Sequence, residues 1–193
     1  MPIDRTEDPN HSLREIFSGL VWRHFFSNVH LEEPEVATYV SELLTQFVQA
    51  DELYRIRNGA GQHLEDIGEM LLESNPLLQA SSFDREREVR KHVGDYVLFM
   101  TGLFPENISR LRRPKQITLG GFLDLVKVGK ESYGIVSSFD QFEYKDEAPL
   151  FRRLSENFEL CICGLNLVKH DLDALQPKQQ RPINRLSGAD SVQ

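Results

Sequence analysis

The stretch REVRKHVGDYVLFMTGLF, residues 87–104, decides the fold class because its apolar residues recur with the period of an α-helix. Each residue of a helix advances by about 100°. On that count five side chains share one face: Val89, Val93, Tyr96, Met100 and Leu103. The segment SSFDRE, residues 81–86, offers Ser and Asp as caps for this helix, and Pro105 ends it. The stretch therefore predicts a long helix with a buried face.

The same period recurs along the chain and predicts about six helices. They cover about residues 13–27, 34–57, 62–74, 82–104, 118–139 and 150–172. No stretch alternates convincingly with the two-residue period of a strand. Short connections favour antiparallel neighbours. We therefore predict an all-α fold, a single-domain bundle over residues 12–172, with a flexible N-terminal segment, 1–11, and a flexible C-terminal tail, 173–193.

The composition is typical of a globular domain and argues against several classes of protein. The chain has 193 residues, of which 40% are apolar and 27% charged, and its net charge is −8. An acidic chain is unsuited to general nucleic-acid binding through bulk electrostatics. The N-terminal MPIDRTEDPNHS lacks the features of a secretory signal, and no apolar run approaches the roughly 18–20 residues of a membrane span. We expect a cytoplasmic protein that binds neither nucleic acid nor membranes.

The two cysteines, Cys161 and Cys163, stand two positions apart within a predicted helix. At that spacing the side chains point to nearly opposite faces, so they cannot form a disulfide with each other. No second pair exists to complete a zinc site. Free thiols agree with a reducing compartment.

His92 and Asp95 form the first candidate site. Relative to the centre of the apolar face, His92 lies about 60° away and Asp95 about 120° away. Their spacing allows Asp95 to accept a hydrogen bond from the imidazole, which would fix its tautomer. A general base or a ligand needs that orientation, and so does a paired polar group at a seam between helices. Because the pair lies on the flank, it need not be buried among apolar side chains, which makes the structural interpretation less costly.

Lys130, in VKVGKESYG, falls near the middle of an apolar face beside Tyr133. A buried ammonium without a partner is costly. Three outcomes follow: the side chain reaches water, it pairs with a carboxylate such as Asp95 or Glu88, or it faces a pocket and holds an anionic ligand. The glycines of this helix are predicted to be positions of close helix packing.

His24 lies at the centre of the apolar face of the first helix. Two inward histidines, His24 and His92, raise the hypothesis of a metal or haem site inside the bundle. The Glu-x-x-His pairs of di-iron bundles are absent, and the chain has the reverse order at His63-x-x-Asp66 and His92-x-x-Asp95. We therefore predict no metal ligands and no cofactor, and keep metal or haem only under an alternative function.

A basic connector over residues 105–117 contains four cations within six residues: Arg110, Arg112, Arg113 and Lys115. Such a cluster could bind phosphate or an acidic partner. No aromatic residue alternates with these cations, so a platform for stacking bases is not indicated. A solvated loop is the simpler interpretation.

These features lead us to expect a non-enzymatic helical interaction or regulatory module with no catalytic residues. The segment LVWRHFF, residues 20–26, has apolar bulk on more than one face, which suits a helix covered by a protein partner or a second copy. The alternative is a bundle that binds a small ligand, metal or haem in a pocket of six residues: His24, His92, Asp95, Tyr96, Lys130 and Tyr133. A second alternative is an adaptor that binds an acidic partner through Arg110–Lys115.

Overall fold

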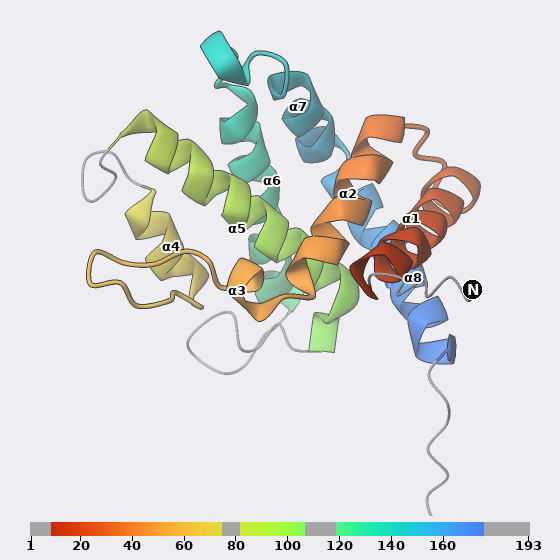
Figure 1. Ribbon diagram of the computed structural model, residues 1–193. Helices are drawn as coiled ribbons and strands as arrows, with labels where there is room; N and C mark the ends of the chain where they lie inside the picture. The colour runs from red at the N-terminus through yellow and green to blue at the C-terminus, as the bar shows by residue number, and fades with distance from the viewer. Residues whose placement is uncertain (1–8, 75–81, 107–118, 176–193) are drawn as a thin grey trace, which may run out of the picture.

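A computed structural model describes residues 9–74, 82–106 and 119–175, and its fold is all-α (Figure 1). Apart from an isolated bridge between Arg57 and His63, these three segments contain no β-structure. Their α-helices are α1 (Pro9–Ser27), α2 (Pro34–Phe47), α3 (Ala50–Leu53), α4 (Ile67–Glu73), α5 (Phe83–Leu103), α6 (Leu119–Ser137), α7 (Ala148–Glu156) and α8 (Phe158–Leu175). A 3-10 turn, η2 (Phe142–Tyr144), lies between α6 and α7. The prediction of an all-α, single-domain bundle is confirmed.

Helix α5, the helix of the opening stretch, runs through the middle of the molecule with α4 on one side and α2 on the other (Figure 1). It begins as predicted, because Ser82 Oγ accepts a hydrogen bond from the Arg85 amide at 3.2 Å, and it ends before Pro105. Every residue from 92 to 99 is buried. The flank of this helix, which need not have been buried, is therefore buried as well, because neighbouring helices cover α5 on several sides.

Glycines let α6 and α8 approach closely to their neighbours. A Cβ atom built on Gly94 would lie 2.6 Å from ring carbons of Tyr133, so only glycine admits that ring. In the same way, a Cβ on Gly129 would lie 2.4 Å from Phe158. Contacts under 3.0 Å require a rearrangement, which these aromatic rings have little room to make. Gly129 confirms the predicted packing role of glycine in this helix.

Two helix boundaries in the first half differ from the prediction. Helix α2 stops at Phe47 instead of continuing past Tyr54, and the chain then turns so that Ile56 is fully buried and Tyr54 faces Tyr96 at 6.3 Å between ring centres. Helix α4 begins at Ile67 because the Asp66 side chain caps it, accepting from the Glu69 amide at 3.1 Å. The end of α2 depends on the burial of Ile56 among distant residues, and the start of α4 depends on the Asp66 cap. The spacing of apolar residues indicates neither of these effects.

The last predicted helix is divided in two at Asn157. Its amide and its side-chain nitrogen both donate to the Arg153 carbonyl at 2.9 Å, which ends α7. The Asn157 carbonyl then accepts from the Cys161 amide, within α8. One non-helical residue hardly changes the angular positions of the side chains that follow it. The apolar residues of α7 and α8 therefore keep one helical period across Asn157.

At the chain ends, residues 9–11 and 173–175 belong to α1 and α8. The remainder of the two predicted flexible ends lies outside the described residues. Within the described part of the chain, no helix combines the length and the apolar character needed to cross a bilayer.

Candidate functional site

Asp95, on α5, links three helices through its carboxylate. It is 3% exposed, and its Oδ1 accepts hydrogen bonds from the hydroxyls of Tyr39 on α2 at 2.6 Å and Tyr133 on α6 at 2.7 Å. Lys91, one turn earlier on α5, donates to Oδ2 at 3.1 Å and brings the opposite charge. These donors replace the water that a carboxylate loses on burial. The group is therefore built to join α2, α5 and α6.

The two tyrosines of this link hold their protons firmly. Burial, and then the negative charge of Asp95, raise the pKa of Tyr39 and Tyr133 well above the ordinary value of 10.0. Each hydroxyl is consequently a hydrogen-bond donor at neutral pH and is already engaged with Asp95. This arrangement offers neither a free base nor a free nucleophile, and its chemistry is that of a structural clamp.

His92 lies beside this link but takes no part in it. The side chain is completely buried between the rings of Phe47 and Tyr96, whose centres lie 5.7 Å and 6.0 Å from the imidazole centre. Neither ring nitrogen meets strict hydrogen-bond geometry with any described residue, although the Leu53 carbonyl is placed to favour a protonated ring, and the bond to Asp95 is absent. Burial first, and then the charge of Arg55, lower the pKa of His92 to about 4. The ring is therefore neutral at pH 7.

His24, the other predicted inward histidine, joins α1 to α8. Its Nε2 lies 2.8 Å from Asp171 Oδ2 and its Nδ1 lies 2.9 Å from Asn28 Oδ1. Arg23 also contacts the same Asp171 carboxylate. His24 and His92 therefore face different partners, instead of lining one cavity. No group of three or more His, Cys, Asp or Glu side chains within the described segments is placed to hold a metal ion.

Lys130 reaches the surface and pairs with Glu159 of α8. Its Nζ lies 2.9 Å and 3.0 Å from the two carboxylate oxygens, and its side chain is about two-fifths exposed. The lysine therefore combines two of the predicted outcomes, because it reaches water and has a carboxylate partner. That partner is neither Asp95 nor Glu88.

The six residues predicted to bind a ligand thus occupy several separate places. Tyr133 and Asp95 are bonded to each other, and His92 is stacked on Tyr96, but His24 and Lys130 pair with separate acidic residues of α8. The second predicted group, Arg110, Arg112, Arg113 and Lys115, lies outside the described residues. The free thiols agree with the prediction, since Cys161 is buried and Cys163 is exposed.

A first surface hollow lies beside α1 and α2. It has a volume of about 320 Å³ and is lined by Trp22, Pro34, Glu35, Thr38, Tyr39, Glu42 and Leu150. Trp22 is 38% exposed and stacks on Phe26, with ring centres 4.9 Å apart. Tyr39 connects this hollow to the core, because its ring lines the hollow while its hydroxyl bonds Asp95.

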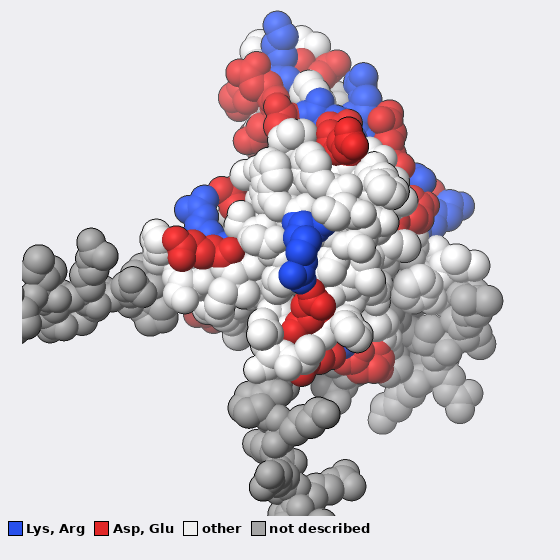
Figure 2. Space-filling view, turned by 90° about the vertical axis from the view of Figure 1, so that its right-hand side faces the viewer, with Lys and Arg blue, Asp and Glu red and all other residues white. Residues whose placement is uncertain are grey.

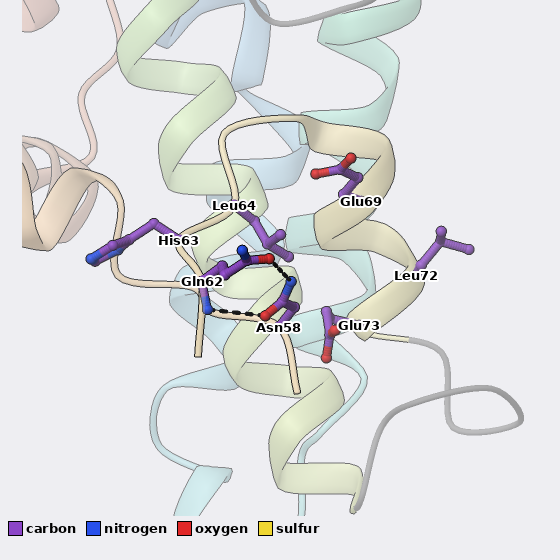
Figure 3. Close-up of a pocket in the computed structure, with 7 residues that line it drawn as sticks. All are labelled: Asn58, Gln62, His63, Leu64, Glu69, Leu72 and Glu73. Carbon is purple, nitrogen blue, oxygen red and sulfur yellow. Dashed lines mark hydrogen bonds between the residues drawn. The ribbon is translucent and has the colours of Figure 1, made fainter. Parts of the chain in front are cut away.

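A second hollow lies between α4 and the loop that precedes it (Figure 3). It has a volume of about 500 Å³ and is lined by Asn58, Gln62, His63, Leu64, Glu69, Leu72 and Glu73. Glu69 and Glu73 lie on the side of α4 that faces Asn58 and Gln62, whereas His63 and Leu72 point away (Figure 3). The sequence interpretation missed this site, although the four-residue spacing of two glutamates was visible.

Comparisons of the chain with protein-family models, with curated proteins and with solved structures found no match.

Proposed function

We propose that this protein is a non-enzymatic helical interaction module that self-associates through the face of α1 that bears Trp22. The observation that carries the proposal is the exposure of two large apolar side chains on α1, Ile16 at 42% and Trp22 at 38%. Tryptophan is a favoured anchor of protein interfaces because it brings a large apolar area with little conformational entropy. The hollow beside Trp22, with its Leu150 and Tyr39 walls, offers a place for such an anchor.

The near-neutral charge of this face is compatible with a second copy of the chain as the partner. Two copies with a net charge of −8 repel each other, so self-association is least costly through a neutral face. Helix α1 carries two arginines and one glutamate, and α8 carries one lysine and three acidic residues, so the two helices contribute a net charge of −1. The side of the molecule that carries these helices shows a broad uncharged area (Figure 2). A two-fold dimer would place Trp22 of each copy against the hollow of the other.

The chemistry of the core supports a non-enzymatic role. Asp95, Tyr39 and Tyr133 are committed to one another, and His92 is enclosed by aromatic rings. None of these groups lines the second hollow, and only the ring of Tyr39 reaches the first. We also propose a cytoplasmic location, for which the free thiols Cys161 and Cys163 are the support.

The test is the mass of the protein in solution as a function of its concentration, measured by light scattering and sedimentation. We expect a dimer for the wild type and a monomer for Ile16→Arg, which places two charges in the contact. Trp22 is the single tryptophan of the chain, so its emission should shift to shorter wavelength on dimerisation in the wild type but not in Ile16→Arg.

Phe142→Arg is the matched control, because Phe142 is the most exposed large apolar side chain among the described residues and lies on η2. It should remain a dimer. A wild type that stays monomeric up to millimolar concentration, or an Ile16→Arg variant with unchanged dimerisation, would refute the proposal.

A further inference from the structure

Glu73 is a largely buried residue whose carboxylate lines a hollow and has no partner among the described residues. The residue is 9% exposed and its side chain lines the hollow beside α4. Within the described part of the chain, no hydrogen bond or ion pair reaches its carboxylate. A buried carboxylate without a donor or a cation is unfavourable, and natural folds pair such groups. The pocket side of Glu73 is therefore a place where a donor or a cation would be stabilised.

The residues around Glu73 in the sequence add negative charge and no lysine or arginine. Between Arg57 and Arg85 the sequence has no lysine or arginine, yet it has five acidic residues: Glu65, Asp66, Glu69, Glu73 and Asp84. The two flanking arginines are engaged elsewhere. Arg57 donates to the Gly61 carbonyl at 2.9 Å, and Arg85 donates to the Arg57 carbonyl and to Glu88, both at 3.0 Å. The carboxylates of α4 are thus left without a basic partner from these neighbours.

The wall opposite α4 is already ordered. Asn58 Oδ1 accepts hydrogen bonds from the amides of Ala60 and Gln62, both at 3.0 Å, and Asn58 Nδ2 donates to Gln62 Oε1 at 3.2 Å. The Leu64 amide donates to the Ile56 carbonyl at 2.9 Å, which holds the ends of the loop together. A wall held by its own hydrogen bonds loses little entropy when a ligand enters.

We propose that this hollow binds an organic cation with alkylammonium groups, and that Glu73 and Glu69 are its carboxylate ligands. Glu69 and Glu73 stand four residues apart on α4, so they present two acceptors on one side of the helix. A volume of about 500 Å³ is large enough for a small amine or for lysine side chains of a peptide. The alkyl part would lie against Leu64, and the ammonium group would donate to the buried Glu73.

A bare divalent metal fits the site less well. Ca²⁺ takes six to eight oxygen ligands and Mg²⁺ demands an octahedral set. The hollow offers two carboxylates, and one of its amide oxygens, Gln62 Oε1, already accepts a hydrogen bond from Asn58. A flexible amine with several N–H donors needs fewer fixed ligands, which favours the organic cation.

The test measures binding of spermidine to the full chain by calorimetry and by NMR shift changes, in buffer with 150 mM salt so that weak surface attraction is screened. We expect Glu73→Gln to lower the affinity about tenfold or more and Glu69→Gln about threefold, since Glu69 is exposed to solvent. Glu65→Gln is the matched control, because it removes one charge from the same exposed stretch outside the lining. It should bind spermidine as the wild type does.

A trilysine amide peptide distinguishes the two sources of the ammonium group. Tighter binding of spermidine indicates a free polyamine, and tighter binding of the peptide indicates lysine side chains of a protein. Failure of both probes to bind would overturn the proposal. An equal loss in Glu65→Gln and Glu73→Gln would reveal a diffuse charge effect, and displacement of spermidine by equimolar Mg²⁺ would reveal a metal site, so either result would also overturn it. Glu69→Gln keeps the test valid if Glu73→Gln does not fold.

Discussion

Asp95 and Glu73 are two buried carboxylates with opposite surroundings. Asp95 lies at the centre of the bundle, where two tyrosine hydroxyls and the Lys91 ammonium donate to it. Glu73 lies at the end of the short helix α4, beside a hollow, and no described group donates to it. Both residues are shielded from most of the solvent, yet the described residues supply hydrogen-bond donors only to Asp95.

A buried charge can stabilise the packing of helices or it can bind a ligand, and the presence or absence of donors distinguishes the two roles. A satisfied carboxylate stabilises the arrangement of the helices that supply its donors, and its removal leaves those donors unpaired. An unsatisfied carboxylate lowers stability, and a ligand that supplies the missing donor recovers the loss. The comparison therefore predicts large stability effects around Asp95 and small ones, of the opposite sign, at Glu73.

Removal of the Asp95 carboxylate should give the largest effect. Asp95→Ala leaves the Tyr39 and Tyr133 hydroxyls and the Lys91 ammonium without an acceptor, and we expect the free energy of unfolding to fall by about 4 kcal/mol. Urea unfolding followed by circular dichroism measures it. Asp95→Asn keeps one oxygen for the tyrosines and should lose about half as much. A loss under about 1 kcal/mol for Asp95→Ala would contradict the structural role.

The enclosed His92 should make stability depend on pH. The ordinary pKa of histidine is 6.5 and that of His92 in the fold is about 4. Between pH 4 and pH 6.5, His92 binds a proton in the unfolded chain but not in the folded chain. The contribution of His92 to the free energy of unfolding is therefore constant above about pH 6.5 and is lost as the pH falls toward 4. We expect this histidine alone to account for about 3 kcal/mol across that window.

The control for this prediction replaces a different histidine. His92→Leu should remove the dependence between pH 6.5 and 4, whereas His11→Gln should retain it because His11 is exposed. Besides burial, the charges of Arg55 and Lys91 lower the pKa of His92, whereas Asp95 and the Leu53 carbonyl raise it. The same slope in wild type and His92→Leu would show that other groups cause the dependence.

Gly94 tests how closely α5 must approach the Tyr133 ring that reaches Asp95. In Gly94→Ala the added Cβ would lie 2.6 Å from ring carbons of Tyr133, and we expect a loss of about 2 kcal/mol in urea unfolding. Gly134→Ala on α6 is the matched control, since its nearest atom is Ser155 Oγ at 3.4 Å. There the helix propensity of alanine should leave stability unchanged or raise it by up to about 1 kcal/mol. Equal effects at both positions would contradict this account.

Glu73 should give the smallest effect, and it should have the opposite sign. Glu73→Gln removes a buried charge that no described residue pairs, so we expect the free energy of unfolding to rise by about 0.5–1 kcal/mol in the absence of ligand. Thermal and urea unfolding of Glu73→Gln measure this change, with Glu65→Gln at an exposed position as the control. A fall of several kcal/mol would place Glu73 with Asp95 as a structural residue and remove the distinction.

Much of the fold could be predicted from the sequence because the signals for it are local. Helical periodicity, the capping segment 81–86 and Pro105 indicated the extent of α5, which the structure places at Phe83–Leu103 with Ser82 as its cap. The two-residue spacing of Cys161 and Cys163 correctly placed their side chains in different environments. The Asn157 break and the early end of α2 escaped prediction, because neither one shifts the apolar period enough to be detected.

The candidate sites could be predicted far less well. Residue types were informative, since Asp95, Tyr133, His92 and Lys130 each have a notable environment, but their partners lie on other helices. Asp95 bonds Tyr39, which is 56 positions earlier, and Lys130 pairs with Glu159, which is 29 positions later. The angular positions of side chains on one helix do not show which neighbouring helix covers each of its faces.

The sequence by itself determined the helical class, the helix formed by the stretch 87–104 and the absence of a bridge between the two cysteines. Only the tertiary structure decided that Asp95 is satisfied and that Glu73 is not. The physical reason is that helix formation depends on neighbours three and four positions away, whereas the hydrogen bonding of a buried charge depends on the groups that distant segments bring to it. Two largely buried carboxylates can therefore serve the fold in one case and face an open hollow in the other.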